Sequence, residues 1–152
     1  MEQIDAPFQA LPVVDPDSRP FWEGCRRHTL LIQRCADCGQ LRFPPAPLCW
    51  RCRSWEYTWE EQAGRGTVYT WVSVHHPIPP SMAPLVPYVV ALIDLEAGVR
   101  MPTRLIEVAP DVMYAGMPVE VRFEEVSDEI TLPLFAPSES GDAGGAAIQA
   151  RA

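Results

Sequence analysis

Four cysteines in two closely spaced pairs constrain the fold of this chain more than any other feature. The pairs read C-A-D-C at 35–38 and C-W-R-C at 49–52, with ten residues between them. A C-x-x-C pair turns two thiolates toward one point, and two pairs complete the tetrahedral ligand set of a closed structural Zn²⁺ site. The sequence therefore predicts a zinc ribbon with two knuckles, whose metal ligands are Cys35, Cys38, Cys49 and Cys52.

Other uses of paired cysteines fit this sequence less well. Two disulfides need an oxidising compartment, and the start M-E-Q-I-D-A-P has neither the basic residues nor the apolar core of a signal peptide. A thioredoxin-type redox pair would not come doubled, and a haem site needs histidine where this chain has Gly39 and Arg53. An iron–sulfur or rubredoxin-type iron site stays open, because four thiolate ligands do not discriminate strictly between iron and zinc. The fifth cysteine, Cys25, is predicted to be a small buried hydrophobe.

The composition is that of one small globular protein. The chain has 152 residues, of which 47% are hydrophobic, and its 17 prolines argue against a mainly helical fold. No stretch approaches the ~20 apolar residues that a membrane helix requires. We therefore expect a soluble, cytoplasmic protein.

Charge is distributed unevenly along the chain. The formal net charge is −8 and every one of the twelve basic residues is arginine, yet residues 19–65 carry a net charge of +3 and the remainder −11. The planar guanidinium of arginine pairs well with phosphate or carboxylate. The cysteine-bearing half is therefore the part suited to an anion, and the candidate contacts are Arg34, Arg42, Arg51 and Arg53.

The first half of the chain predicts an arm, a helix and a ribbon. Residues 1–16 are rich in proline and acidic residues and have no hydrophobic period, which indicates an extended arm. A capping Asp17 or Ser18 and an early Pro20 predict a short helix over about 18–27, weakened by Gly24 by ~1 kcal/mol. Strands are expected at 30–33, 41–43 and 55–60, so that residues 17–62 form the helix and zinc ribbon.

The second half predicts a small closed barrel. Short runs of β-branched and aromatic residues alternate with glycine turns and show no helical period. The predicted strands are 67–74, 88–95, 99–108, 119–125 and 130–135. Five strands over this length fit an OB-fold at 63–137 better than a two-sheet sandwich. Residues 138–152 are mainly serine, glycine, alanine and acids, and are predicted to be disordered.

Several local motifs together resemble one protein family. They are F-W-E-G (21–24), L-I-Q-R-C-A-D-C-G (31–39), R-F-P-P (42–45), C-W-R-C (49–52), G-R-G-T-V-Y-T-W (64–71), P-Y-V-V-A-L-I-D-L (87–95), G-M-P-V-E-V (116–121) and L-P-L-F-A-P (132–137). This order is similar to a bacterial and archaeal family with an N-terminal helix, a rubredoxin-like zinc ribbon and a C-terminal OB-fold. The resemblance covers about residues 15–137. One departure is Trp50, where many members have proline, which alters the knuckle turn and leaves the ligands unchanged.

The resemblance implies an accessory role in acyl-CoA metabolism. Members of the family accompany thiolase-like enzymes, including steroid side-chain aldolases of lipid-transfer type, or hot-dog-fold enoyl-CoA hydratases. They support the partner or help to hold the CoA ester, and they are not known to supply catalytic residues. For this chain the thiolase or aldolase group is favoured, with two copies flanking a partner dimer. A partner would cover the apolar residues Phe21, Trp22, Ile78, Met82 and Leu85.

Two other classes of function were weighed against this hypothesis. Zinc ribbons and OB-folds often bind single-stranded nucleic acid, but an acidic chain without lysine lacks the basic groove that this requires. A free-standing enzyme is suggested by the pair His75-His76, with Cys25 and His28. No general base comes with an orienting partner at a recognisable spacing, and a four-cysteine metal site leaves no open position for substrate. We therefore expect no catalytic residues in this chain.

Overall fold

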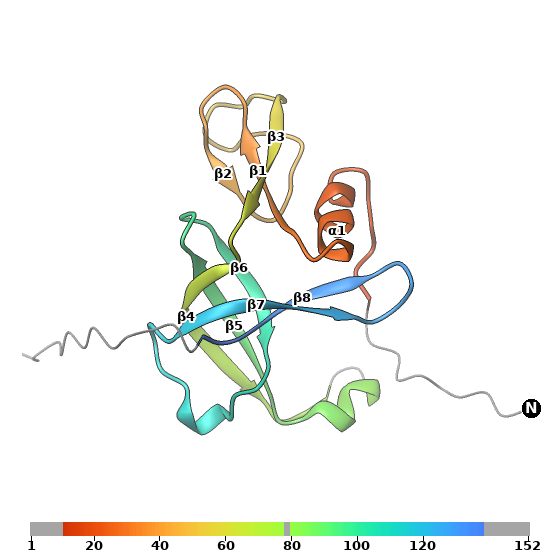
Figure 1. The fold of residues 1–152 in the computed structure, drawn as a ribbon, viewed down its shortest axis with the longest axis vertical. Coiled ribbons are helices and arrows are strands. Elements are labelled where there is room, and N and C mark those ends of the chain that lie inside the picture. The colour runs from red at the N-terminus through yellow and green to blue at the C-terminus, as the bar shows by residue number, and fades with distance from the viewer. Residues whose placement is uncertain (1–10, 78–79, 139–152) are drawn as a thin grey trace, which may run out of the picture.

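The computed structural model describes residues 11–77 and 80–138. The elements in this part of the chain are α1 (Arg19–Arg26), β1 (Leu30–Cys35), β2 (Leu41–Arg42), β3 (Tyr57–Gln62), β4 (Arg65–Val74), η1 (Pro80–Leu85), β5 (Tyr88–Leu95), β6 (Arg100–Leu105), η2 (Pro110–Val112), β7 (Pro118–Glu125) and β8 (Thr131–Pro137). Most of the predicted arm and nearly all of the predicted tail lie outside the described residues. A small sheet occupies one end of the molecule, a barrel the other, and α1 lies beside both (Figure 1).

The small sheet has the strand order β2-β1-β3, and all its neighbours are antiparallel. β1 and β2 form the predicted hairpin, with the first cysteine pair at its tip. The third strand begins at Tyr57 rather than at Trp55 and runs to Gln62. This register aligns all six residues of β1 with β3, so that Leu30 pairs with Gln62 and Cys35 with Tyr57.

The second sheet is a closed five-stranded barrel in the order β4-β5-β6-β8-β7. Its last strand runs parallel to β6 and antiparallel to β7, while β4 pairs with both β5 and β7. Every second residue of β5 is buried, because alternate side chains point into the barrel. The prediction of a mostly β fold with a short N-terminal helix and a five-stranded barrel is confirmed.

The helix joins the sheet and the barrel. Its buried residues are Phe21, Gly24 and Cys25, and it packs against both β1 and β8. A Cβ atom on Gly24 would lie 2.8 Å from the carbonyl oxygen of Thr29 and 2.9 Å from Cγ of Leu31. Glycine therefore allows the close approach of α1 to β1, and the loss of helix propensity noted in the sequence is secondary to this packing.

The long connection between β4 and β5 contains a short helix that the sequence did not predict. The segment η1 is a 3₁₀ helix within the predicted loop. Within residues 11–77 and 80–138, no helix is long and apolar enough to cross a membrane.

Candidate metal centre and adjoining surfaces

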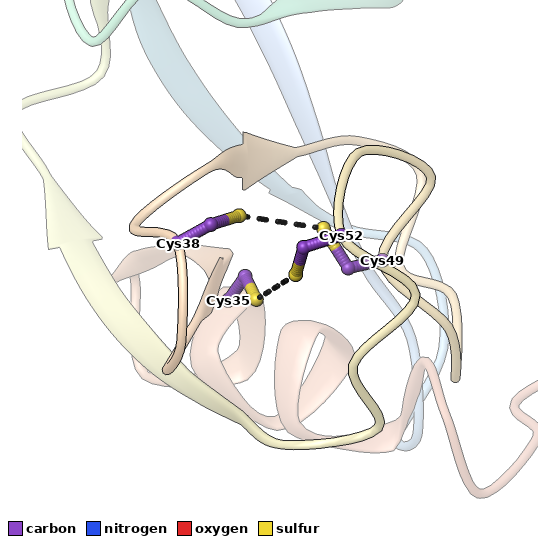
Figure 2. Close-up of side chains that lie close together, drawn as sticks. All are labelled: Cys35, Cys38, Cys49 and Cys52. Carbon is purple, nitrogen blue, oxygen red and sulfur yellow. Dashed lines mark hydrogen bonds between the residues drawn. The ribbon is translucent and has the colours of Figure 1, made fainter.

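The four paired cysteines converge on one point. Their Sγ atoms all lie within 4.8 Å of one another. The sulfur of Cys35 lies 3.5 Å from that of Cys52, and the sulfur of Cys38 lies 3.7 Å from that of Cys49, so each contact joins one pair to the other (Figure 2). A tetrahedral site with Zn–S bonds of about 2.3 Å has sulfurs about 3.8 Å apart. The donor set and its spacing therefore fit a structural metal ion.

The two knuckles share one backbone geometry. In each, the residue after the second cysteine donates its N–H to the carbonyl of the first: Gly39 to Cys35 over 3.0 Å, and Arg53 to Cys49 over 2.8 Å. These two residues have positive φ angles of 72° and 62°. The second knuckle thus keeps the same turn as the first, although it contains Trp50. Trp50 is 71% exposed.

The backbone of the knuckles favours thiolates. The backbone N–H of Cys52 is the main cause that lowers the pKa of Cys49 to about 6, and that of Cys38 lowers the pKa of Cys35. The Ser54 N–H acts on Cys52 in the same direction, but burial and the three neighbouring sulfurs raise the pKa of Cys52 to about 12. Four thiolates at this spacing therefore need a cation among them. Burial raises the pKa of Cys25 to about 12, in keeping with its predicted role as a buried hydrophobe.

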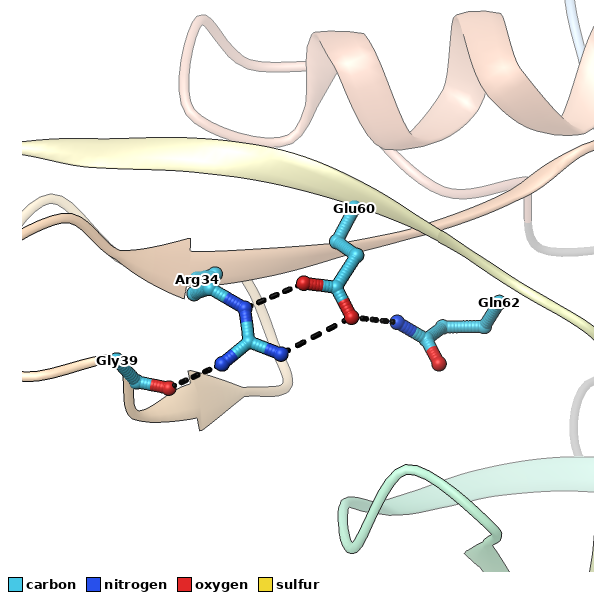
Figure 3. A network of polar contacts seen from close by, with 4 residues as sticks. All are labelled: Arg34, Gly39, Glu60 and Gln62. Carbon is cyan, nitrogen blue, oxygen red and sulfur yellow. Dashed lines mark hydrogen bonds and ion pairs between the residues drawn. The ribbon is translucent and has the colours of Figure 1, made fainter.

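A polar network fastens the first knuckle to β3. Both Nε and Nη2 of Arg34 donate to the carboxylate of Glu60, the second over 3.0 Å, while Nη1 donates to the carbonyl of Gly39 over 2.7 Å (Figure 3). Gln62 donates to the same carboxylate over 3.0 Å. The Arg34 guanidinium is therefore the principal cause that lowers the pKa of Glu60. This predicted anion contact is largely engaged within the ribbon.

The other three candidate arginines differ in exposure. Arg42 is only 5% exposed; its Nε donates to Oε1 of Gln33, and its Nη1 and Nη2 have no hydrogen-bond partner among the described residues. Arg51 and Arg53 are exposed. A hollow of about 240 Å³ beside the first knuckle is lined by both Arg34 and Arg51. The structure thus brings two of the four candidates together and buries a third.

Three of the five predicted partner-contacting residues line the same groove. Phe21, Trp22 and Met82 line one apolar groove between α1, η1 and the barrel. Leu85 lines an adjoining hollow, and Ile78 lies outside the described residues. Because these residues come from elements far apart in sequence, no local pattern indicated that they share a surface.

Three apolar residues of the ribbon are exposed, and the sequence did not mark them as partner-contacting. Leu48, Trp50 and Trp55 belong to the second knuckle and the segment after it, and their side chains are 38%, 71% and 67% exposed. The available signal was the tryptophan at position 50, where many members of the resembling family have proline.

Two family models match consecutive parts of the chain. Residues 22–57 match "ChsH2, rubredoxin-like zinc ribbon domain", and residues 59–124 match "ChsH2, C-terminal OB-fold domain". The first range covers most of α1, the strands β1 and β2 and both knuckles, and the second covers most of β3 and the barrel strands β4 to β7.

Two curated relatives and one solved structure extend this likeness. A probable enoyl-CoA hydratase alpha subunit from Thermomonospora curvata is 40% identical over 90% of this chain and 42% of its own length. The 3-oxo-4,17-pregnadiene-20-carboxyl-CoA hydratase alpha subunit from Mycobacterium tuberculosis is 38% identical over 84% of this chain and 40% of its own. The chain thus spans about two fifths of these relatives.

The solved structure is the Ltp2-ChsH2(DUF35) aldolase, one chain of which superposes with a TM-score of 0.76. That chain is 42% identical, and the match covers 84% of the present chain and 98% of the other. Both domain models and this nearly complete match show that the chain belongs to the ChsH2/DUF35 family, whose members combine a rubredoxin-like zinc ribbon with a C-terminal OB-fold domain.

Proposed function

We propose that this chain is a non-catalytic accessory subunit that stabilises a thiolase-like enzyme, of the thiolase or steroid side-chain aldolase type, and helps to bind the CoA ester. The observation that carries the proposal is the match over 98% of a chain of the Ltp2-ChsH2(DUF35) aldolase. The hydratase alpha subunits match over only 40–42% of their length. The aldolase chain is therefore the more complete counterpart.

Assembly with a hot-dog-fold hydratase is the second candidate. It is supported by the names of the two curated relatives, both hydratase alpha subunits. The two candidates place the same ribbon and barrel beside different catalytic partners. The two candidate functions are therefore distinguished by identifying the partner enzyme that the chain binds.

We propose that the four-cysteine cluster holds Zn²⁺ and that the ion is structural. Four thiolates fill a tetrahedral coordination sphere and leave no position for substrate or water. The ion supplies cross-linking between the two knuckles and no acid–base chemistry. The residues of the ribbon then present a fixed surface to the partner.

The CoA ester would meet the arginine side of the ribbon. Arg51 and Arg34 line one hollow, and Arg53 is exposed two residues beyond Arg51, so the guanidinium groups of Arg51 and Arg53 can approach a phosphate, while that of Arg34 is already engaged by Glu60 and Gly39. The sequence also suggests Arg42 as an anion contact. Because this residue is buried, its guanidinium could contact a ligand only after the surrounding ribbon residues moved. The proposal for anion contacts therefore rests mainly on Arg51 and Arg53, with Arg34 as a partly engaged third contact.

The partner would cover apolar surface on the ribbon. Exposed tryptophans are frequent anchors in protein interfaces, because a large apolar body leaves water on binding. Trp50 and Trp55 have this exposure, and Leu48 is a further exposed apolar residue nearby in sequence. This surface belongs to the same domain as the arginines, so one docking event can bring the partner and its CoA ester together.

The proposal is tested by co-expressing the chain with thiolase-like and hydratase-like proteins of its own organism and measuring which one is captured. Retention of the thiolase-like protein supports the aldolase assignment, and retention of the hydratase-like protein supports the alternative. Trp50→Ala should weaken capture at least tenfold, whereas Tyr114→Ala, at a residue 54% exposed on the barrel side, should not. Capture of neither protein would refute both.

A further inference from the structure

An apolar groove lies on the outer wall of the barrel. Its volume is about 390 Å³, within the range of pockets that enclose small ligands. The barrel contributes Val90 from β5, Pro102 from β6 and Leu132 from β8, while Trp22 of α1 and Met82 of η1 form the opposite side. Successive side chains of β5 and β6 alternate between the buried core and this outer wall.

The position of the groove within the fold is informative. OB-folds bind chain-like ligands on the face of their second and third strands, next to the loop between the first and second strands. In this barrel those strands are β5 and β6, and the loop carries η1. The groove therefore occupies the face on which other OB-folds bind oligonucleotides or oligosaccharides.

The chemistry of this face does not suit a polyanion. Binding of single-stranded nucleic acid requires a positively charged groove, and among the residues that the structure describes Arg104 is the one cation that lines this groove. The Nη2 atom of Arg104 lies 3.2 Å from the carboxylate of Glu124, so the charge of the guanidinium is already balanced. The ligand that fits is apolar and carries no net charge where it meets the wall.

Arg104 lies where this groove meets a second hollow. This second hollow of about 260 Å³, lined by Leu85 and Ile106, shares Tyr88 and Arg104 with the groove. An elongated ligand could therefore extend past Arg104 from one hollow into the other.

We propose that this groove binds the acyl body of the CoA ester, with a long chain extending past Arg104 toward the second hollow. The inference rests on the proposed function, because that function supplies the acyl-CoA ester. In this proposal the apolar acyl part of the ligand binds between the barrel and α1, and the anionic phosphate part binds separately at the ribbon.

The test is calorimetric titration of the full zinc-loaded chain with hexanoyl-, octanoyl- and decanoyl-CoA, and with CoA alone. Affinity should rise roughly two- to fourfold for each added methylene, because each removes apolar surface from water. Val90→Trp, which fills the groove, should remove this dependence on chain length and weaken decanoyl-CoA binding at least tenfold. Val112→Trp is the matched control at a valine 56% exposed on η2, and should behave as the wild type.

Leu132→Gln supplies a second variant that places an amide in the groove without adding bulk. Zinc content and thermal melting identify any variant that fails to fold. Equal affinities for the three chain lengths in the wild-type protein, or an unchanged dependence in the folded Leu132→Gln variant, would overturn the inference. Co-elution with the thiolase-like protein is measured in parallel: an intact complex without acyl-chain binding refutes the groove alone, and acyl-chain binding without a complex refutes the accessory role alone.

Discussion

At Gly24, helix propensity and packing demand different residues. Alanine in a helix interior is favoured over glycine by about 1 kcal/mol, but here its Cβ would lie 2.8 Å from a carbonyl oxygen of the following turn. We expect Gly24→Ala to lower the free energy of unfolding by about 1–2 kcal/mol, since overpacking exceeds the gain in propensity. Chemical denaturation measures this, with Glu23→Ala on the exposed side of α1 as the control. Stabilisation by Gly24→Ala would show that α1 does not pack this closely.

Among the arginines, composition indicated where positive charge gathers but not which side chains are free. Arg42 is buried on Gln33, and Arg34 is held by Glu60, because cross-strand neighbours decide the environment of a side chain. A net charge summed over a segment does not contain this information. By contrast, the spacing of the four cysteines in the sequence was enough to predict that their sulfurs share one site.

Removal of Arg51 should affect ligand binding without affecting the metal. We expect Arg51→Ala to weaken binding of the CoA ester to the co-purified complex roughly tenfold, the cost of one charge-assisted hydrogen bond. Arg26→Ala removes the same charge from the exposed side of α1 and should change affinity little. Isothermal titration and zinc analysis check both variants. Equal affinities of the two variants would remove Arg51 from the site.

The ribbon depends on its metal for folding. Its sheet is small, and a structural Zn²⁺ site contributes on the order of 10 kcal/mol to the folding of such a domain. Cys49→Ala should therefore abolish stoichiometric zinc binding and unfold residues 30–62, as seen by the loss of their amide protection from hydrogen exchange. Cys25→Ala, in the buried core, should keep the metal. A folded ribbon in Cys49→Ala would contradict this dependence.

An ion pair fastens the β5–β6 hairpin. Asp94 and Arg100 are direct cross-strand neighbours, joined by hydrogen bonds of 2.6 and 3.0 Å, and the guanidinium also lies 3.3 Å from the ring centroid of Tyr69. Hydrogen bonding from Arg100 lowers the pKa of Asp94. The pair therefore adds stability above the unfolded-state pKa of about 3.9, and this contribution is lost as pH falls through the lower folded-state pKa.

We expect Arg100→Gln to raise the pKa of Asp94 toward its ordinary value. Carboxyl carbon NMR titration measures the change directly. Arg122→Gln breaks a different pair, with Glu120, and should leave the titration of Asp94 unchanged. An unaltered Asp94 titration in Arg100→Gln would show that the ion pair does not form in solution.

Elements bounded by turn residues or by an early proline were predicted well, and those whose limits depend on pairing were not. The bounds of β5 follow from an apolar run between Pro87 and the turn at 96–98, and the start of α1 follows from an early proline. The third strand was placed two residues early, because the aromatic alternation of 55–60 gives no register, and register is set by pairing with β1. The 3₁₀ helix η1 was missed in a segment rich in proline, where local signals favour a loop.

At the scale of the whole molecule, the surfaces that matter combine distant segments. The groove joins α1, η1 and three barrel strands, which only the closed barrel brings together. The ribbon surface at Leu48, Trp50 and Trp55 is local, yet its exposure depends on the turn of the second knuckle. Sequence motifs predicted the family and fold, whereas the arrangement of these surfaces required coordinates.

The most direct test is the molar mass of a mixture of this chain with the thiolase-like protein that it captures on co-expression, measured by size-exclusion chromatography with light scattering. A two-fold partner dimer presents two equivalent sites, so we expect one peak that contains two copies of each chain. The metal-free Cys49→Ala variant should fail to enter this peak. Separate elution of zinc-loaded wild-type chain and partner, at concentrations well above those in the cell, would contradict the accessory role.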